Sequence, residues 1–542
     1  LQLPEAVARR GFSANERQPQ AIAGLCRSET LAIICFAVFL LLRPQSPLRY
    51  PVSVDSTSTP NSNDSALSLP ALSWVWLRHL ASFLIPLTTV AFLWTGPHPW
   101  YIAPLFMLPP ILALSLDSNA TIEQRQPLTS TPAWPFDLIV YALAAIQVLI
   151  IYLLAQMFSL QGFFSVDTAM IVLVVGGSSG FSIITAHELI HRTKPWERNF
   201  GRLVLATVLQ EHFYTEHLRG HHVKVATEDD PATARFGEDY EAFYRRTVPG
   251  QFKSAWRLET KRLGDPEMSL FDRRMLGNRV IHGLALGWGI AVAIGVGFGW
   301  VSFLAFVLQA LMASRLLEAV NYFEHWGLRR TTRRIRAIDS WDTHSWYTYY
   351  GLTGLSRHAD HHRDPSRPFQ QLQVFEEAPI LPTGYIGMID LVSGKVHEFK
   401  KYAVEELQRR ELGPFSSETD PAEAAKAHEI AEQILAYEPK PPPGLFGPNA
   451  KGESGGLVVA KRVAIRLGIV LAITFGSQFE SAGELSFTSR FVLNTWIIAA
   501  FVVMVTVFRR LLDRELNASL SFAMALAVLV TIGTLTTRVT GL

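Results

Sequence analysis

The sequence HELIH at residues 187–191 follows an apolar run at 166–186 and contains the first candidate metal ligands. On a helix, His187 and His191 lie one turn apart, so their side chains point in the same direction. Two imidazoles on one helix face form half of a metal site, with Glu188 as a candidate general base. The motif also matches H-E-x-x-H, the helical signature of zinc metalloproteases. We therefore expect an apolar helix that ends in a metal-binding turn.

The apolar run before HELIH belongs to a series of similar runs along the chain. Each approaches or reaches the roughly 20 residues that a helix needs to cross a bilayer. They occupy residues 72–94, 100–116, 136–158, 166–186, 279–298, 300–320, 490–508 and 517–536, with weaker runs at 30–43 and 462–478. A soluble protein would have to hide too much apolar surface. The sequence therefore predicts an all-α integral membrane protein with a six-helix transmembrane core and extra C-terminal transmembrane helices.

The composition changes along the chain and divides it into four regions. They are an N-terminal extension with a candidate anchor helix and a Pro/Ser/Thr-rich linker (1–71), a membrane domain that carries the clustered histidines (72–412), a polar amphipathic linker (413–460) and a C-terminal transmembrane module (461–542). We expect the function to lie in the second region, because it holds the candidate ligands.

Positive charge is concentrated on one side of the predicted spans. Segment 192–278 holds 15 Lys and Arg residues, whereas the short connections 95–99 and 159–164 hold none. By the positive-inside rule, the polar segments and the histidines beside them face the cytoplasm. The net charge of +2, without a basic patch interleaved with aromatic residues, predicts no nucleic-acid partner.

Most histidines fall in four short stretches next to the ends of the predicted spans. The stretches are HELIH (187–191), EHLRGHH (216–222), NYFEHWGL (321–328) and RHADHH (357–362). They supply nine candidate ligands, namely His187, His191, His217, His221, His222, His325, His358, His361 and His362. His217 and His221 are spaced i, i+4, and His358 is i, i+3 and i, i+4 from His361 and His362, so each cluster can present two or three imidazoles in one direction.

Nine imidazoles exceed the three protein ligands of a catalytic zinc ion. Two metal ions with four or five ligands each would use all of them. Imidazole suits Fe, Cu, Zn and Ni, so the ligand type leaves the metal open. The isolated histidines are interpreted as interface, loop or surface residues, namely His79, His98, His282, His397 and His428.

Carboxylates accompany the histidine clusters. A metal-bound imidazole usually donates its other N–H to a carboxylate or a carbonyl. Glu188, Glu324 and Asp360 are the candidates for this role, and Glu216, Asp229 and Asp230 are further acids near the second cluster. The alternative is that some of them cap helices or face solvent.

The motifs together resemble a known family. HELIHR, EHLRGHHVKVATEDDPATARFGE, NYFEHWGL and LSRHADHHRDPSRPFQQLQ, followed by ILPTGYIGM, are similar to segments of the membrane-bound alkane 1-monooxygenases, or alkane ω-hydroxylases. These enzymes are part of the fatty acid desaturase-like membrane di-iron superfamily. The resemblance covers roughly residues 72–400, and NYFEHWGL distinguishes this group from ordinary desaturases.

The resemblance implies a specific enzyme. The family has six spanning helices and a cytoplasmic cap in which these nine histidines hold two iron ions. It uses O₂ to hydroxylate the terminal carbon of an alkane, with electrons from a rubredoxin and its NAD(P)H-dependent reductase. The two cysteines of this chain are too few for a fused rubredoxin, so the donor is expected to be a separate protein. The implied location is the bilayer of a bacterial inner membrane or of a eukaryotic membrane.

An alkane has no polar group, so only an apolar channel can position it. The bundle 72–158 is a candidate lining for such a channel. Three alternatives stay open at this point. One is the same di-iron chemistry on an alkyl-aromatic compound, a fatty acid or a terpene. The second is an intramembrane zinc protease, which explains HELIH but leaves the other clustered histidines without a role. The third is a metal transporter, which predicts ligands within the spans rather than at their ends.

Overall fold

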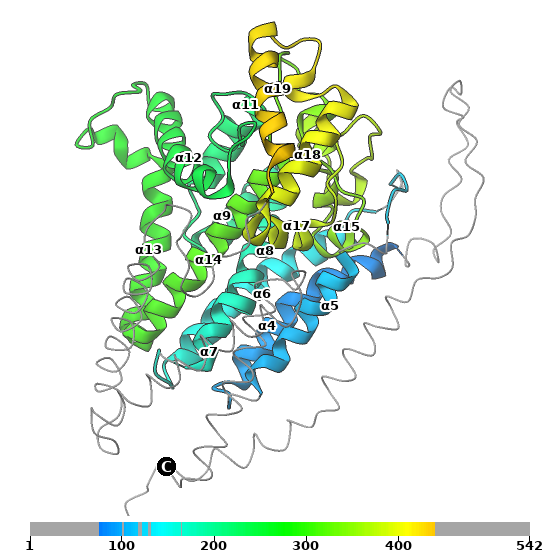
Figure 1. The fold of residues 1–542 in the computed structure, drawn as a ribbon. Helices are drawn as coiled ribbons and strands as arrows, with labels where there is room; N and C mark the ends of the chain where they lie inside the picture. The colour runs from blue at the N-terminus through cyan, green and yellow to red at the C-terminus, as the bar shows by residue number, and fades with distance from the viewer. Residues whose placement is uncertain (1–74, 100–101, 118–121, 128–131, 164, 439–542) are drawn as a thin grey trace, which may run out of the picture. The chain divides into compact units, whose positions relative to one another are not determined.

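The computed structural model describes residues 75–99, 102–117, 122–127, 132–163 and 165–438, which belong to one compact unit of the chain (Figure 1). Every regular element in those ranges is a helix. This confirms the predicted all-α fold. The predicted N-terminal anchor and the C-terminal transmembrane module lie outside the described residues.

Among the described residues, five helices are long and apolar enough to cross a membrane. They are Val75–Thr95, which ends with α4 (Leu84–Thr95), α6 (Trp134–Phe158), Val166–His191, which ends with α8 (Gly176–His191), α13 (Arg279–Phe298) and α14 (Trp300–His325). The run predicted as a further span at 100–116 forms the shorter apolar helix Ala103–Asp117, which contains α5 (Leu108–Asp117). The predicted number of six core spans is therefore not confirmed.

Helices α8 and α14 pack against each other through small residues on α8. A Cβ atom on Gly176 would lie 2.4 Å from Met312 Cβ, and one on Gly180 would lie 2.8 Å from Leu316 Cδ2. The missing side chains let the two backbones approach closely, as small residues do in membrane bundles. Because α8 ends at His191 and α14 ends at His325, this packing brings histidines of two spans together.

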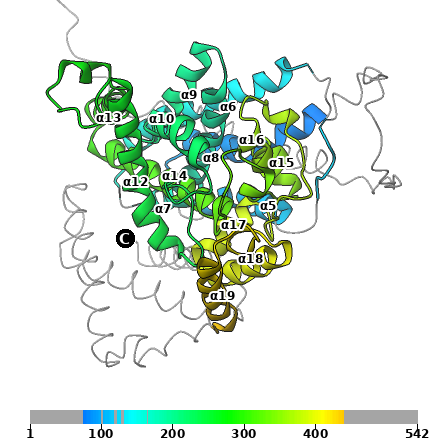
Figure 2. The same cartoon turned by 90° about the horizontal axis from the view of Figure 1, so that it is seen from above.

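A cap of further helices covers the end of the bundle at which α8 and α14 stop (Figure 1). Viewed from above, α8 and α14 lie near its centre, beside the short helix that carries the last histidine cluster (Figure 2). The cap contains α12 (Tyr240–Arg262), α16 (His358–Arg363), α17 (Tyr385–Gly394), α18 (Val396–Arg410) and α19 (Pro421–Ala436).

An apolar core holds the cap together. The indole rings of Trp326 and Trp341 are fully buried in it, and Ala431 of α19 packs into the same cluster. The first part of the segment predicted as a linker at 413–460 is therefore packed on the cap. The burial of two tryptophans after His325 fixes the chain where it leaves the membrane span.

Candidate metal centre

The nine predicted histidines lie together at the junction of the spans and the cap, and they divide into two groups. Within each group, one donor atom per residue lies within 4.8 Å of the donor atoms of the others. The five-histidine group consists of His187, His191, His217, His222 and His361. The four-histidine group consists of His221, His325, His358 and His362. Four segments that are distant in the sequence therefore build two adjacent clusters of imidazoles.

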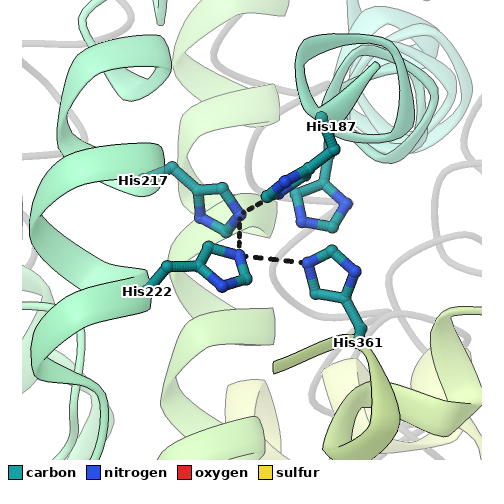
Figure 3. Close-up of side chains that lie close together, drawn as sticks. His187, His217, His222 and His361 are labelled. Atoms are coloured by element: carbon teal, nitrogen blue, oxygen red, sulfur yellow. Dashed lines mark hydrogen bonds between the residues drawn. The ribbon is translucent and has the colours of Figure 1, made fainter. Parts of the chain in front are cut away.

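The imidazoles of the five-histidine group face one another through their Nε2 atoms. Figure 3 shows His217 and His222 on one helical segment, opposite His187 and His361 from two other segments. The Nε2 atom of His217 lies 3.1 Å from that of His191 and 2.9 Å from that of His222. The Nε2 atom of His222 lies 3.1 Å from that of His361.

The four-histidine group has the same arrangement. His362 Nε2 lies 2.9 Å from His358 Nε2 and 3.2 Å from His221 Nε2. His358 Nε2 lies 3.3 Å from His325 Nε2. Metal–nitrogen bonds of about 2.1 Å at right angles place two ligand nitrogens about 3.0 Å apart. Both groups therefore have the spacing of nitrogens that share one ion.

Burial keeps these side chains in the form that binds metal. Burial, reinforced by the neighbouring imidazoles, lowers the pKa well below its ordinary value for the candidate ligands outside the spans, namely His217, His222, His358, His361 and His362. These imidazoles are neutral at pH 7. A neutral imidazole offers a lone pair to a metal ion, whereas an imidazolium does not.

A π-helical turn decides how the second cluster is divided. Residues His217–His221 form this turn, which begins directly after α10 (Phe213–Glu216). A π-helix has i→i+5 backbone hydrogen bonds and is wider than an α-helix, so residues five apart come close to the same face. His217 and His222 therefore join the same group, while His221 joins the other.

The fourth cluster is divided as well. His358 and His362, at i and i+4 on α16, enter the four-histidine group, and His361 enters the five-histidine group. The expected pairing of His217 with His221 is therefore wrong, whereas the expected pairing of His358 with His362 is confirmed. Because each of these two segments contributes to both groups, the groups are held at a fixed separation.

Asp230 bonds to the ring nitrogen of His221 that points away from the four-histidine group. Its Oδ2 lies 2.9 Å from His221 Nδ1 and accepts the Thr233 hydroxyl at 2.6 Å. Burial acts to raise the pKa of Asp230, but the contacts with His221 and Thr233 hold that pKa below its ordinary value. The sequence did not distinguish Asp230 from its neighbour Asp229, which is exposed.

The three predicted carboxylates differ in their contacts. Glu324 Oε2 lies 3.3 Å from Nε2 of His358, a member of the four-histidine group. Glu188 instead forms an ion pair of 2.7 Å with Arg192, which also lies 2.9 Å from Asp137 on α6. Glu188 therefore joins α8 to α6.

Asp360 also bonds away from the histidines. Its Oδ2 accepts the backbone N–H of Gln373 at 2.8 Å and lies 3.0 Å from Arg367 Nε. Among the contacts of the described residues, neither Glu188 nor Asp360 bonds to an imidazole. Asp360 fixes the loop that follows α16.

Tyr385 is a residue of the site that the sequence analysis did not name. Its hydroxyl donates to Glu324 Oε1 at 2.5 Å. Burial and the adjacent Glu324 carboxylate raise the pKa of Tyr385 well above its ordinary value, so the phenol stays protonated and donates. The segment ILPTGYIGM was the signal, because it follows the last histidine cluster and contains this tyrosine.

His79 differs from the surface, loop or interface position expected of it. The side chain is fully buried, and its ring packs against Phe136, Tyr349, Tyr350 and Phe369. That interpretation is therefore wrong for His79. The error has a physical reason, since these rings come from segments that only the fold brings together.

An apolar cavity lies between α8 and α14 and reaches both histidine groups. Its apolar lining includes Phe181, Ile184, Leu316 and Val320. It is also lined by His187, His217, His221 and His358, and by Glu324 as its one carboxylic acid. A second cavity, lined in part by residues of the 72–158 bundle, shares Phe181 and Ile184 with the first. These two side chains form the wall between the cavities.

Comparisons with known proteins agree with the motifs. Residues 166–391 match the family model of fatty acid desaturases. The chain is 38% identical over 215 residues to alkane 1-monooxygenase 1 of Pseudomonas aeruginosa, which covers 39% of this chain and 56% of that protein. It is 36% identical over 236 residues to the alkane 1-monooxygenase of Acinetobacter baylyi, which covers 41% of this chain and 56% of that protein.

A more distant relative is the hydroxylase component of the xylene/toluene monooxygenase of Pseudomonas putida. It is 24% identical over 202 residues, which covers 37% of this chain and 54% of that protein. The chain thus spans little more than half the length of these three relatives. The predicted resemblance to the alkane 1-monooxygenase family is confirmed by these matches.

Proposed function

We propose that this chain is a membrane monooxygenase of the alkane 1-monooxygenase type, which uses O₂ to convert an alkane to a 1-alkanol. One observation supports this proposal most strongly. Nine histidines from four segments, seven of them buried and two (His191 and His222) half-buried, form two groups with the spacing of metal ligands, and an apolar cavity reaches both groups. A pair of metal sites at the end of an apolar cavity suits oxidation of a substrate without polar groups.

The nine histidines fit two metal ions, and the similarity to alkane 1-monooxygenases favours iron. Buried acids near the groups support a cationic occupant. Asp230 and Glu324 are 1% and 2% exposed, and in the described part of the chain neither is paired with a Lys or Arg side chain. A buried carboxylate without a cation is costly, so a positive ion between the imidazoles would stabilise both acids.

Bound iron would supply the activation of O₂, while the chain supplies position and shielding. One oxygen atom enters the terminal C–H bond, and the other is reduced to water. The lining side chains Phe181, Ile184, Leu316 and Val320 exclude water and hold the alkane by shape alone. His187 and His358, which line the same cavity, place its reactive end at both groups.

The electrons are proposed to come from a separate rubredoxin and its NAD(P)H-dependent reductase. The nine histidines of the two groups lie beside the Arg-rich segment 192–278, which directly follows His191 and itself contains His217, His221 and His222. The positive-inside rule supports a cytoplasmic position for this face. The membrane is proposed to be a bacterial inner membrane or a eukaryotic one.

The zinc protease is the weaker alternative. In such an enzyme Glu188 would have to act on a metal-bound water, but it is held by Arg192. In addition, His187 and His191 share their group with three further imidazoles, which leaves little room for a peptide. The similarity to a xylene/toluene monooxygenase component keeps an alkyl-aromatic substrate as a second candidate for the same chemistry.

Metal analysis of the detergent-purified chain tests the proposal. We expect one iron ion per histidine group, with a loss in both His325→Ala and His361→Ala, because each variant removes a ligand of a different group. The loaded protein should then hydroxylate a series of alkanes when O₂, a rubredoxin and its reductase are supplied. A single zinc ion that neither variant displaces would contradict the proposal.

A further inference from the structure

The two histidine groups differ in ligand number, and a carboxylate lies beside the smaller one. Five imidazoles form one group and four form the other. Glu324 directly precedes His325 on α14, and its Oε2 lies 3.3 Å from His358 Nε2. This equals the distance between the Nε2 atoms of His358 and His325. The carboxylate oxygen is therefore as close to His358 as a neighbouring ligand nitrogen is.

The second oxygen of Glu324 is occupied by Tyr385. The Tyr385 hydroxyl donates to Oε1 at 2.5 Å, and both side chains are almost completely buried. A charge-assisted hydrogen bond of this length is strong. The same hydroxyl lies 3.0 Å from the Leu355 carbonyl oxygen, so Glu324 Oε1 is the nearer of its two acceptors. The other carboxylate oxygen, Oε2, is the one that lies 3.3 Å from His358 Nε2.

Tyr385 is itself held by a chain of hydrogen bonds. Its backbone N–H donates to Thr348 Oγ1 at 2.9 Å, and the Thr348 hydroxyl donates to Asp117 Oδ1 at 2.6 Å. Asp117 Oδ2 accepts the N–H of Ile386 at 2.7 Å. These bonds fix the first turn of α17 against α5, so the segment ILPTGYIGM places the tyrosine hydroxyl at a defined point.

We propose that Tyr385 is a positioning residue that holds Glu324 as an oxygen donor for the ion of the four-histidine group. This inference rests on the proposed function. With Glu324, each group has five donors. The carboxylate also brings a negative charge to a site of neutral imidazoles, which favours a cation. Glu324 also lines the apolar cavity, so this residue borders both the cavity and the four-histidine group.

Iron release from the purified full chain tests this role without an activity measurement. The variants are Tyr385→Phe, Glu324→Gln and the double variant, with Tyr402→Phe as a matched control. Tyr402 also donates its hydroxyl in the cap, to the backbone oxygen of Ile380 at 2.9 Å. The rate of iron removal by a chelator and the Mössbauer spectrum of the iron-loaded protein are measured for each variant.

We expect Glu324→Gln and Tyr385→Phe each to weaken the binding of one of the two ions, by about 10- to 100-fold. The double variant should release iron as Glu324→Gln does, because Tyr385 acts through Glu324. Tyr385→Phe should also change the spectrum of one iron site, whereas Tyr402→Phe should match the wild type.

Additive effects in the double variant, or a Tyr385→Phe protein that matches Tyr402→Phe, would overturn the inference. If Tyr385→Phe does not fold, the Glu324→Gln variant still tests whether Glu324 is an oxygen donor. Unchanged iron release from Glu324→Gln would overturn that role. A wild-type chain that binds no iron contradicts the proposed function. Two firmly bound irons that these variants do not affect contradict only the present inference.

Discussion

Replacing Asp230 by asparagine should weaken one of the two metal sites. The Asp230 carboxylate accepts from His221 Nδ1 at 2.9 Å, from the Thr233 hydroxyl at 2.6 Å and from the Ala232 N–H at 3.1 Å. An amide has a single acceptor oxygen, so the side chain of the Asp230→Asn variant cannot keep both Oδ2 contacts and the Oδ1 contact. His221 then loses the partner that fixes its ring orientation and raises its basicity as a ligand.

The expected loss of metal affinity follows from the loss of this hydrogen-bond partner of His221. Removing a carboxylate that orients a metal-bound imidazole costs about 10- to 100-fold in metal affinity. That factor corresponds to about 1.4–2.8 kcal/mol at the four-histidine group. The five-histidine group should keep its affinity, because His221 is not part of it.

Competition with a chelator measures the effect. The purified protein is titrated with a chelator of known iron affinity, and the iron that remains is counted for Asp230→Asn and for Asp229→Asn. Asp229 is the adjacent acid and is exposed, so its variant controls for the loss of one charge. If both variants release iron like the wild type, the argument that Asp230 supports His221 is refuted.

Three further predictions concern the cavity, the helix packing and the pH dependence. Phe181→Ala should join the two cavities and shift the product distribution towards longer alkanes, whereas truncation of the exposed Phe271 should not; gas chromatography of products from an alkane mixture measures this. Gly180→Ala should destabilise the fold by about 1–3 kcal/mol, because its Cβ would overlap Leu316 between α8 and α14, and a lower melting temperature in detergent is the readout. Acid should destabilise the iron-free protein. Below about pH 6.5 the histidines bind protons in the unfolded chain, whereas in the folded chain the buried imidazoles stay neutral. The melting temperature should therefore fall as the pH drops below that value, and a flat profile between about pH 7 and 5 would contradict the buried, neutral state of His217, His222, His358, His361 and His362.

The sequence by itself identified the histidines and the membrane helices. Apolar runs of about 20 residues have few stable alternatives to a spanning helix, because a bilayer core offers no water to unpaired backbone groups. Histidines at the ends of such runs indicate a functional site, because an ionisable side chain at this position carries a desolvation cost. The pattern therefore predicted all nine members of the two groups, together with the proximity of Glu324 to one of them.

The tertiary structure decided which histidines share a group and which acids contact them. The local rule of i, i+4 neighbours failed at His217–His221, because a π-helical turn places His217 with His222. Glu188 resembled a catalytic base in the sequence, yet Arg192 and α6 engage it.

Contacts between distant segments determine the remaining features of the site, namely the position of Tyr385 and the apolar cavity. Tyr385 reaches Glu324 across 61 residues of sequence, and the apolar cavity depends on how α8 packs on α14. Spacing along a helix determines only which side chains share a face. The partner that each face meets depends on the packing of whole helices, where close contact between small residues and the burial of aromatic rings select one arrangement.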